Sequence, residues 1–290
     1  MNRPTVLITG KNGQLGLELQ EIEKNFQELN LIFLDRSDLD ITDTTAVDKA
    51  FESYRPQYFI NTAAYTAVDK AESDRETAFL INATAVGDIA NYCKLYQTKL
   101  IHISTDYVFD GNSPNAYLET DETNPVNYYG FSKREGEKLA LINNPETLII
   151  RTSWVYGKYG NNFVKTMVRL MNERSDLNVV NDQFGSPTSA KDLAETILKI
   201  VRNDFNKKIY FRPGIYHYSN LGKISWFEFA DKIAAVKSFS CNVHPVATSQ
   251  YPTAAKRPQF SVLSKEKIKN DYQIDLKNWE DSLRSCLEKL

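Results

Sequence analysis

The regular alternation of strand-like and helix-like segments, from the N-terminus to about residue 154, restricts the fold of this chain more than any other feature. Each short apolar run of strand length is followed by a segment with helical periodicity or by a loop and then a helix. Short crossovers of this kind require parallel strands with helices on both faces of the sheet. The predicted strands are 5–9, 31–35, 58–63, 99–104 and 147–153, and the predicted helices are 14–24, 44–54, 75–96 and 128–141. We therefore predict an α/β fold with a doubly wound parallel sheet.

A less regular part follows residue 154 and predicts a smaller α/β lobe beside the sheet. Ser189 or Thr188 is expected to cap one of its helices, while Pro and Gly interrupt 212–222. Its predicted elements are helices at 161–173, 189–201 and 225–236, a short strand at 177–182, and an amphipathic C-terminal segment with Trp279 and Leu283. With a boundary between 155 and 185, we expect a main domain of 1–155 plus parts of 180–220, and a lobe of 156–180 and 220–290.

Composition argues against several classes of partner. The formal net charge of -2, from 35 basic and 37 acidic residues, provides no bulk electrostatic reason to expect nucleic acid or an anionic membrane surface. No window approaches the roughly 20 apolar residues of a membrane span, and the start shows no long apolar signal segment. Cys93, Cys241 and Cys286 are widely spaced, which favours reduced thiols over a disulfide or metal site. We expect a cytoplasmic protein.

The carboxyl ends of the predicted strands are rich in glycine and polar residues, and ligands of open parallel sheets bind at that edge. The loop GKNGQLG after the first strand has GxxGxxG spacing, which lets the backbone approach a pyrophosphate at a helix N-terminus. Taken alone, the glycines would equally suit a tight strand-to-helix turn. Their position after the first strand favours a Rossmann-like dinucleotide site, with candidate contacts Gly10, Asn12, Gly13, Gln14, Leu15 and Gly16.

Two adjacent residues after the second predicted strand bear on the choice of cofactor. Asp35 is placed to accept hydrogen bonds from an adenosine ribose, which favours NADH. Arg36 could neutralise the 2′-phosphate of NADPH, or could be a solvated surface charge. Either cofactor therefore remains open.

The stretch NYYGFSK contains the most promising proton-transfer pair. Tyr129 and Lys133 lie four residues apart on one helical face, and a nearby ammonium stabilises a phenolate. Tyr128 pairs with Ser132 at the same spacing and is expected to serve packing. The Ser104 and Thr105 hydroxyls, after the fourth predicted strand, could stabilise an oxyanion or simply cap the loop; His102 and His217 are expected to be structural.

Together these motifs resemble the extended short-chain dehydrogenase/reductase superfamily, and within it the dTDP-4-dehydrorhamnose reductase family. The matches extend from residue 5 to about 260, and they read GKNGQLG, NTAAYTAVDKAE, STDYVFDG, YYGFSKREGE, RTSWVYG, NNFVKTM, NDQFGSPT and YPTAAKRP. The resemblance implies reduction of dTDP-4-dehydro-β-L-rhamnose to dTDP-β-L-rhamnose by hydride from NADPH or NADH, as a step toward rhamnose-containing polysaccharides. A homodimer or a complex with other rhamnose-pathway enzymes is also implied by the resemblance.

The same resemblance implies roles for individual residues. Tyr129 would donate the proton, Lys133 would bind the nicotinamide ribose and tune the phenol, and Thr105 would hold the reacting oxygen. Further cofactor contacts would be Asp40, Ile41, Ala63, Ala64, Tyr65 and Thr66, and substrate contacts would be Val68, Ser104, Thr105, Trp154 and Arg257. Some family members bind Mg²⁺ at a dimer interface. Here Glu18 matches one ligand but Lys191 stands where another carboxylate would be expected, so we predict no metal.

Two other functions share parts of this motif set. A sugar-nucleotide dehydratase would need an Asp-Glu pair after the threonine, whereas this chain has Asp106-Tyr107; the motifs of the smaller lobe argue against an epimerase. A non-catalytic binding protein is the other alternative, because the motifs also resemble the regulatory subunit of methionine adenosyltransferase. Retention of Thr105, Tyr129 and Lys133 together favours an enzyme.

Overall fold

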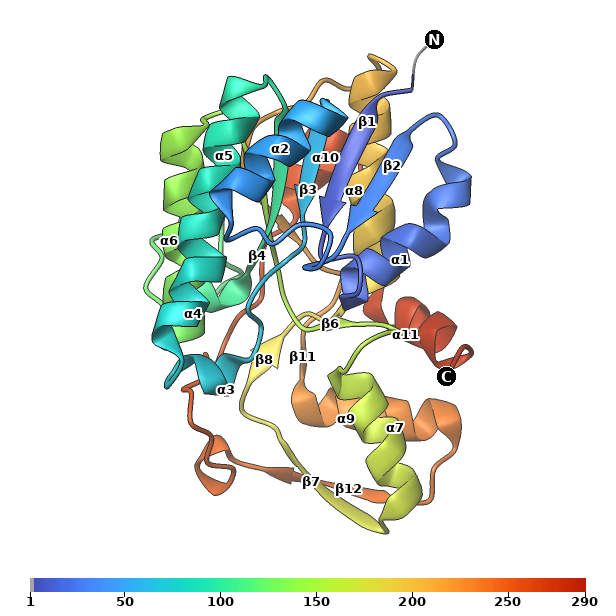
Figure 1. Cartoon of the computed structure of the whole chain (residues 1–290). Helices are drawn as coiled ribbons and strands as arrows, with labels where there is room; N and C mark the ends of the chain where they lie inside the picture. Colours follow the sequence, from blue (N-terminus) through green and yellow to red (C-terminus); the bar gives the residue numbers. More distant parts are fainter. Residues whose placement is uncertain (1–2) are drawn as a thin grey trace.

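A parallel sheet forms the centre of the computed structural model, which describes residues 3–290 (Figure 1). Within these residues six strands pair in the order β10-β5-β4-β3-β1-β2, and every pairing among them is parallel. Most of these strands are nearly continuous apolar runs, as expected for strands buried on both faces. Their bounds are β1 (Thr5–Thr9), β2 (Asn30–Leu34), β3 (Tyr58–Asn61), β4 (Lys99–Thr105), β5 (Leu148–Thr152) and β10 (Gly214–Tyr218). The predicted Rossmann-like α/β fold is confirmed.

Helices cover both faces of the sheet (Figure 1). One face packs against α1 (Gln14–Ile22), α8 (Ala190–Phe205) and α10 (Glu266–Tyr272). The opposite face packs against α2 (Thr44–Tyr54), α5 (Ala85–Leu95) and α6 (Tyr128–Asn143). Since the chain runs from β2 across β1 to β3, the strand order reverses beside β1, which is where such sheets bind ligands.

Side chains at the helix ends fix where several of these helices begin. Asn127 caps α6 by accepting a hydrogen bond from the Gly130 N–H at 2.8 Å. Of the two candidate caps for α8, Ser189 is the one that accepts a hydrogen bond from a backbone N–H, that of Asp192.

The predicted helix at 75–96 consists of α4 (Arg75–Phe79), a π-helical turn at Leu80–Thr84 and then α5. A short helix, α3 (Val68–Ala71), precedes it.

The smaller lobe lies beyond the carboxyl edge of the sheet (Figure 1). Its helices bury Phe229, Trp279 and Leu283 in a core separate from those on the two faces of the sheet. The helices are α7 (Phe163–Glu173), α9 (Trp226–Lys237) and α11 (Trp279–Leu287), and the strands are β7 (Asp176–Val180), paired with β12 (Asn242–Val246), and the short pairs β6 (Val155–Tyr156) with β9 (Thr188–Ser189) and β8 (Phe184–Gly185) with β11 (Ile224–Ser225).

Two parts of the structure differ from the sequence-based expectation. Residues 214–218 form strand β10 of the main sheet, although Pro and Gly led us to expect only an interrupted segment there. Helix α10, within the 220–290 range expected for the smaller lobe, buries Ile268 and Tyr272 against the main sheet instead.

The three cysteines are free thiols. None of the helices within residues 3–290 is both long and apolar enough to cross a membrane.

Candidate active site

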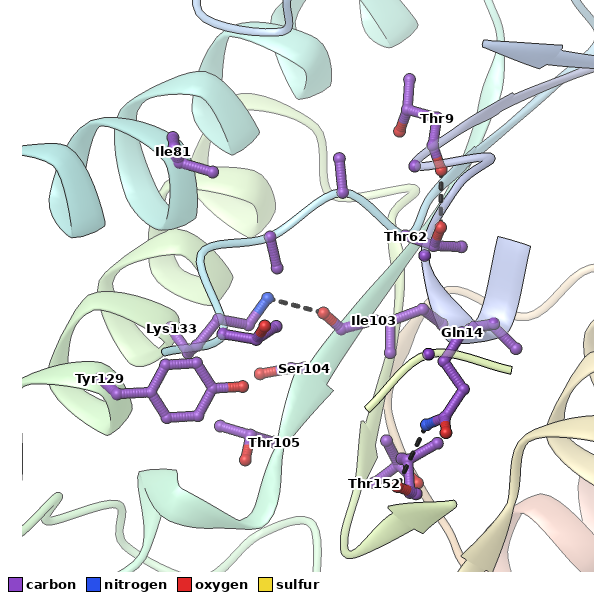
Figure 2. A pocket seen from close by; sticks show the side chains of 18 of the residues that line it. Thr9, Gln14, Thr62, Ile81, Ile103, Ser104, Thr105, Tyr129, Lys133 and Thr152 are labelled. Atoms are coloured by element: carbon purple, nitrogen blue, oxygen red, sulfur yellow. Dashed lines mark hydrogen bonds between the residues drawn. The ribbon is translucent and has the colours of Figure 1, made fainter. Parts of the chain in front are cut away.

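A cavity of about 900 Å³ lies at the carboxyl ends of β1, β3, β4 and β5 and extends to the smaller lobe. Side chains from the sheet strands and loops and from α6 meet there (Figure 2), and Trp226 of the smaller lobe also lines the cavity. This is the reversal point of the strand order, where the fold predicts a ligand. Of the predicted residues, the wall contains Gly10, Asn12, Gly13, Gln14, Leu15, Asp35, Arg36, Asp40, Ile41, Ala63, Ala64, Thr66, Val68, Ser104, Thr105, Tyr129, Lys133 and Trp154.

The glycine loop has the close backbone packing that a dinucleotide cradle needs. Gly10 adopts φ +80°, and a Cβ there would lie 2.6 Å from the Thr62 Oγ1 atom. A Cβ at Gly16 would lie 2.2 Å from the Gly10 carbonyl oxygen, so only glycine allows α1 to pack this closely on the loop. Gly13 precedes α1 and supplies no side-chain cap, which leaves N–H groups of the first helical turn for an anion. The residues present fit a bound dinucleotide.

Charged side chains surround the predicted ribose site. The Asp35 carboxylate accepts a hydrogen bond from Asn12 at 3.0 Å and pairs with Lys11 at 3.0 Å. Hydrogen bonds from Ser37 and Lys11 hold the Asp35 pKa well below its usual range. Arg36 is exposed and pairs with Asp40 at 3.0 Å. Lys11, which sequence analysis missed, pairs with both Asp35 and Asp38 and so adds a cation next to these carboxylates.

Tyr129 and Lys133 project from α6 toward the end of β4, and both line the cavity (Figure 2). Lys133 is 1% exposed, and its Nζ atom donates a hydrogen bond to the Ile103 carbonyl oxygen at 2.7 Å. Tyr128 is not part of the cavity wall. Its ring lies 4.9 Å from the Arg75 guanidinium carbon and 5.5 Å from the Phe131 ring, which is a packing environment.

Burial governs the protonation of this pair. Burial raises the pKa of Tyr129 to about 12, although the neighbouring Thr105 hydroxyl opposes the rise. Burial lowers the pKa of Lys133 to about 8, with Glu137 acting in the opposite direction. Tyr129 is therefore a protonated phenol near neutrality, as a proton donor must be, while Lys133 can exchange a proton close to neutral pH.

Two polar atoms at the end of β4 have no hydrogen-bond partner, whereas the Asp106 Oδ1 atom accepts from the Thr105 hydroxyl at 3.0 Å. The Ser104 Oγ and Asp106 Oδ2 atoms are buried and unpartnered at the cavity wall. Buried polar atoms of native proteins are usually paired, so unpaired ones at a cavity indicate where a ligand would bond. Burial also raises the pKa of Asp106 to about 6.

Two stacked tryptophans, one after β5 and one at the start of α9, form the cavity wall on the side of the smaller lobe. The Trp154 and Trp226 rings lie 3.5 Å apart between centroids at an angle of 10°. Trp154 has φ +48°, a left-handed conformation that is unfavourable for a residue with a side chain. A Cβ on Gly185 would lie 2.6 Å from the Trp154 ring, so the indole is confined between Gly185 and Trp226. Sequence analysis found Trp154 but missed Trp226.

Three predicted residues lie outside the cavity wall. Gly16 packs behind the loop, as described above. The Tyr65 hydroxyl donates a hydrogen bond to Asp74 at 3.0 Å. Arg257 donates to both Asp69 carboxylate oxygens, at 2.8 and 2.6 Å, and thereby holds the 251–258 segment against α3. Besides Trp226, the wall residues that sequence analysis did not assign to the site include Thr9, Thr62, Ile81, Thr152, Asn161 and Leu193.

At the site considered for a metal ion, a buried glutamate lies beside basic side chains. Glu18 is 2% exposed, and burial raises the pKa of its carboxyl. Lys158 and Lys191 both line the small cavity beside it. Within residues 3–290 no group of three or more His, Cys, Asp or Glu side chains could hold a metal. The expectation of no metal stays a prediction.

The fold and the cavity define an NAD(P)-dependent oxidoreductase of the extended short-chain dehydrogenase/reductase class. The family model described as RmlD substrate binding domain matches residues 4–290. A dTDP-4-dehydrorhamnose reductase from Sinorhizobium fredii is 40% identical over 281 residues, which cover 96% of this chain and 94% of that protein. The Escherichia coli strain K12 enzyme of that name is 40% identical over 98% of this chain and 97% of its own.

A solved structure gives the same result. The Bacillus anthracis dTDP-4-dehydrorhamnose reductase in complex with NADP superposes with a TM-score of 0.93, at 42% identity over 100% of both chains. The chain belongs to the dTDP-4-dehydrorhamnose reductase family, as the sequence motifs predicted.

Proposed function

We propose that this protein reduces dTDP-4-dehydro-β-L-rhamnose to dTDP-β-L-rhamnose with NADPH or NADH. The observation that carries the proposal is the meeting of Tyr129, Lys133 and Thr105 in one cavity with the glycine loop. Membership of the family and the names of its relatives support the substrate. The Asp106-Tyr107 sequence remains an argument against a dehydratase, which would need a second carboxylate at Tyr107.

The chain's own residues would bind the cofactor and control a proton. The loop from Gly10 to Gly16 and the first turn of α1 would hold the pyrophosphate, and the cofactor would supply a hydride to C4 of the sugar. The Thr105 hydroxyl would hydrogen-bond the carbonyl oxygen as negative charge develops on it. Tyr129 would then give its phenolic proton to that oxygen, which is favourable because an alkoxide is a stronger base than a phenolate.

Trp154 and the unpartnered Ser104 Oγ, which both line the cavity, would orient the substrate. Val68 would contact the substrate from the start of α3. Arg257, which lies outside the wall, would act indirectly, because it holds the 251–258 segment to Asp69.

The test is the loss of NADPH absorbance when dTDP-4-dehydro-β-L-rhamnose is added to the purified protein. Tyr129→Phe removes the proton donor and should lower kcat by roughly 10²- to 10⁴-fold. Its NADPH dissociation constant should change little. Tyr128→Phe is the matched control, because the neighbouring tyrosine lies outside the cavity wall, and should retain most activity. Cofactor binding without oxidation in the unmodified protein would reject the reductase, and equal losses in both variants would reject Tyr129 as the donor.

The assembly and location are further parts of this proposal. A homodimer or a complex with other enzymes of the pathway would be detected by light scattering of the purified protein, alone and mixed with those enzymes. A cytoplasmic location would suit three free thiols, which persist in a reducing compartment. Fractionation of the source cells would test it.

A further inference from the structure

Lys133 lies at one end of a buried row of hydrogen-bonded polar side chains that crosses three strands of the sheet. Its Nζ atom lies 3.1 Å from Nε2 of His102, which is 0% exposed. The His102 Nδ1 atom lies 3.2 Å from the Asn61 Nδ2 atom, and the Asn61 Oδ1 atom accepts a hydrogen bond from Thr9 at 2.8 Å. The parallel register pairs Thr9 with Asn61 and Asn61 with His102, so the sheet itself aligns this chain.

A backbone group fixes the orientation of the Asn61 amide. The Ala63 N–H donates to Asn61 Oδ1 at 3.2 Å, and a backbone N–H can only donate. The amide oxygen must therefore face Ala63 and Thr9, and the amide nitrogen must face His102. Since that nitrogen carries only hydrogens, His102 Nδ1 has to accept.

The Asn61 orientation determines the tautomer of His102, because a neutral imidazole has one N–H and one acceptor nitrogen. Burial and the nearby Lys133 hold the pKa of His102 well below its usual range, so the ring is neutral. With Nδ1 accepting, the proton resides on Nε2, and this N–H faces Lys133. An ammonium would present another donor to it, whereas a neutral amine presents a lone pair.

We propose that Asn61 and His102 are positioning residues for Lys133: Asn61 keeps the His102 proton on Nε2, and this N–H hydrogen-bonds the neutral amine form of Lys133. The neutral amine is the state left after the Lys133 ammonium passes a proton toward the Tyr129 phenolate. The phenol is thereby restored, the amine accepts the His102 N–H, and solvent later returns a proton to Lys133. The relevance to turnover rests on the proposed reductase function, but the arrangement itself can be measured without turnover.

The other titratable groups around Lys133 do not replace this interaction. Tyr129 and Glu137 come from the same helix, one turn before and one turn after it. Glu137 favours the ammonium, but its carboxylate is already paired with Arg151 of β5, with hydrogen bonds of 2.7 to 3.1 Å. On β4 the facing titratable group is His102, and Asp106 lies beyond Thr105 at the end of that strand.

The first test uses the unmodified protein with NADP⁺ bound and needs no substrate. Long-range proton–nitrogen spectra of ¹⁵N-histidine protein should show the His102 proton on Nε2 at pH 7 to 8. Asn61→Asp replaces the amide donor by an acceptor and should move the proton to Nδ1. Thr9→Val is the matched control for the tautomer, because the Ala63 N–H still orients Asn61. A proton on Nδ1 in the unmodified protein would overturn the proposal whether or not the protein is a reductase.

The second test follows the titration of Lys133 by ¹³Cε-lysine spectra of the same complex. In Asn61→Asp the His102 Nε2 atom becomes an acceptor for the ammonium, so the titration midpoint should move up by about one pH unit. A double-mutant cycle separates the direct effect of the new charge on the Lys133 midpoint from the effect transmitted through the His102 ring. In a His102→Leu background the shift should fall to less than about half, and an equal shift in both backgrounds would show that the ring transmits nothing.

Discussion

Trp226 should contribute to substrate affinity by holding Trp154 in an unfavourable conformation at the cavity wall. The two rings are stacked at 3.5 Å, and Trp154 keeps φ +48°. The capping box between Ser225 and Glu228 fixes the start of the helix that carries Trp226. Trp226→Ala removes the stacking surface and leaves the Trp154 backbone free to relax.

The magnitude follows from the stacked geometry. An aromatic pair contributes about 0.5–1.5 kcal/mol beyond its buried area. At 1.4 kcal/mol for each tenfold change, the KM for the sugar nucleotide should rise by about 2-fold to 12-fold. The KM for NADPH should stay nearly constant, because the glycine loop and Asp35 lie on the sheet side of the cavity. Trp226→Phe keeps an aromatic face and should show a smaller rise.

Two measurements check this together. Steady-state assays at saturating NADPH give the KM for the sugar nucleotide, and near-ultraviolet circular dichroism reports the electronic coupling of the stacked indoles. Of the three tryptophans, Trp279 lies in the core of the smaller lobe, so a coupling signal lost in Trp226→Ala identifies the cavity pair. An unchanged KM in a variant that has lost this signal would refute the reasoning.

Three further predictions concern stability and cofactor choice. Glu137→Ala leaves the buried Arg151 charge unpaired and should lower the free energy of unfolding by about 3–5 kcal/mol in urea titrations, whereas truncating the exposed Glu173 should cost less than about 1 kcal/mol. Burial raises the pKa of Asp106 from 3.8 to about 6. The neutral Asp106 carboxyl therefore stabilises the folded state below about pH 4, and this contribution is lost as pH rises to 6. Asp106→Asn should therefore gain stability relative to the unmodified protein across that window, by up to about 3 kcal/mol; a pH-independent difference would contradict this. Arg36→Ala should raise the KM for NADPH roughly tenfold and leave that for NADH almost unchanged; an equal change for both would remove Arg36 from phosphate binding.

The predictability of the sheet from sequence depended on how apolar each strand is. The runs that became β1, β3, β4 and β5 are buried on both faces, so each is recognisable without knowledge of its neighbours. Strand β10 contains Tyr216, His217 and Tyr218 and is flanked by Pro213, so neither apolar continuity nor alternation marks it. It is an edge strand that gains its burial from β5 and α10, which only the tertiary structure reveals.

The candidate site was predictable wherever one rule connects position with function. Polar residues that follow parallel strands gather at one edge, and this rule located the glycine loop, Ser104, Thr105 and Trp154. Trp226 belongs to the smaller lobe and follows no strand of the sheet, so its place beside Trp154 depends on how α9 packs. The same limit applies to Arg257, whose partner Asp69 is far away in sequence.

His102 shows how a correct structural expectation can coexist with chemistry that only strand register reveals. The expectation of a structural residue agrees with its place in β4 and its complete burial. Register then places His102 beside Asn61, and Asn61 beside Thr9, across three parallel strands. A shift of one residue would turn these side chains to the opposite face of the sheet and away from Lys133. The strand pairing that forms the apolar core therefore also orients the hydrogen-bonding protons next to Lys133. A change of register at Asn61 should alter both the core packing and these hydrogen bonds.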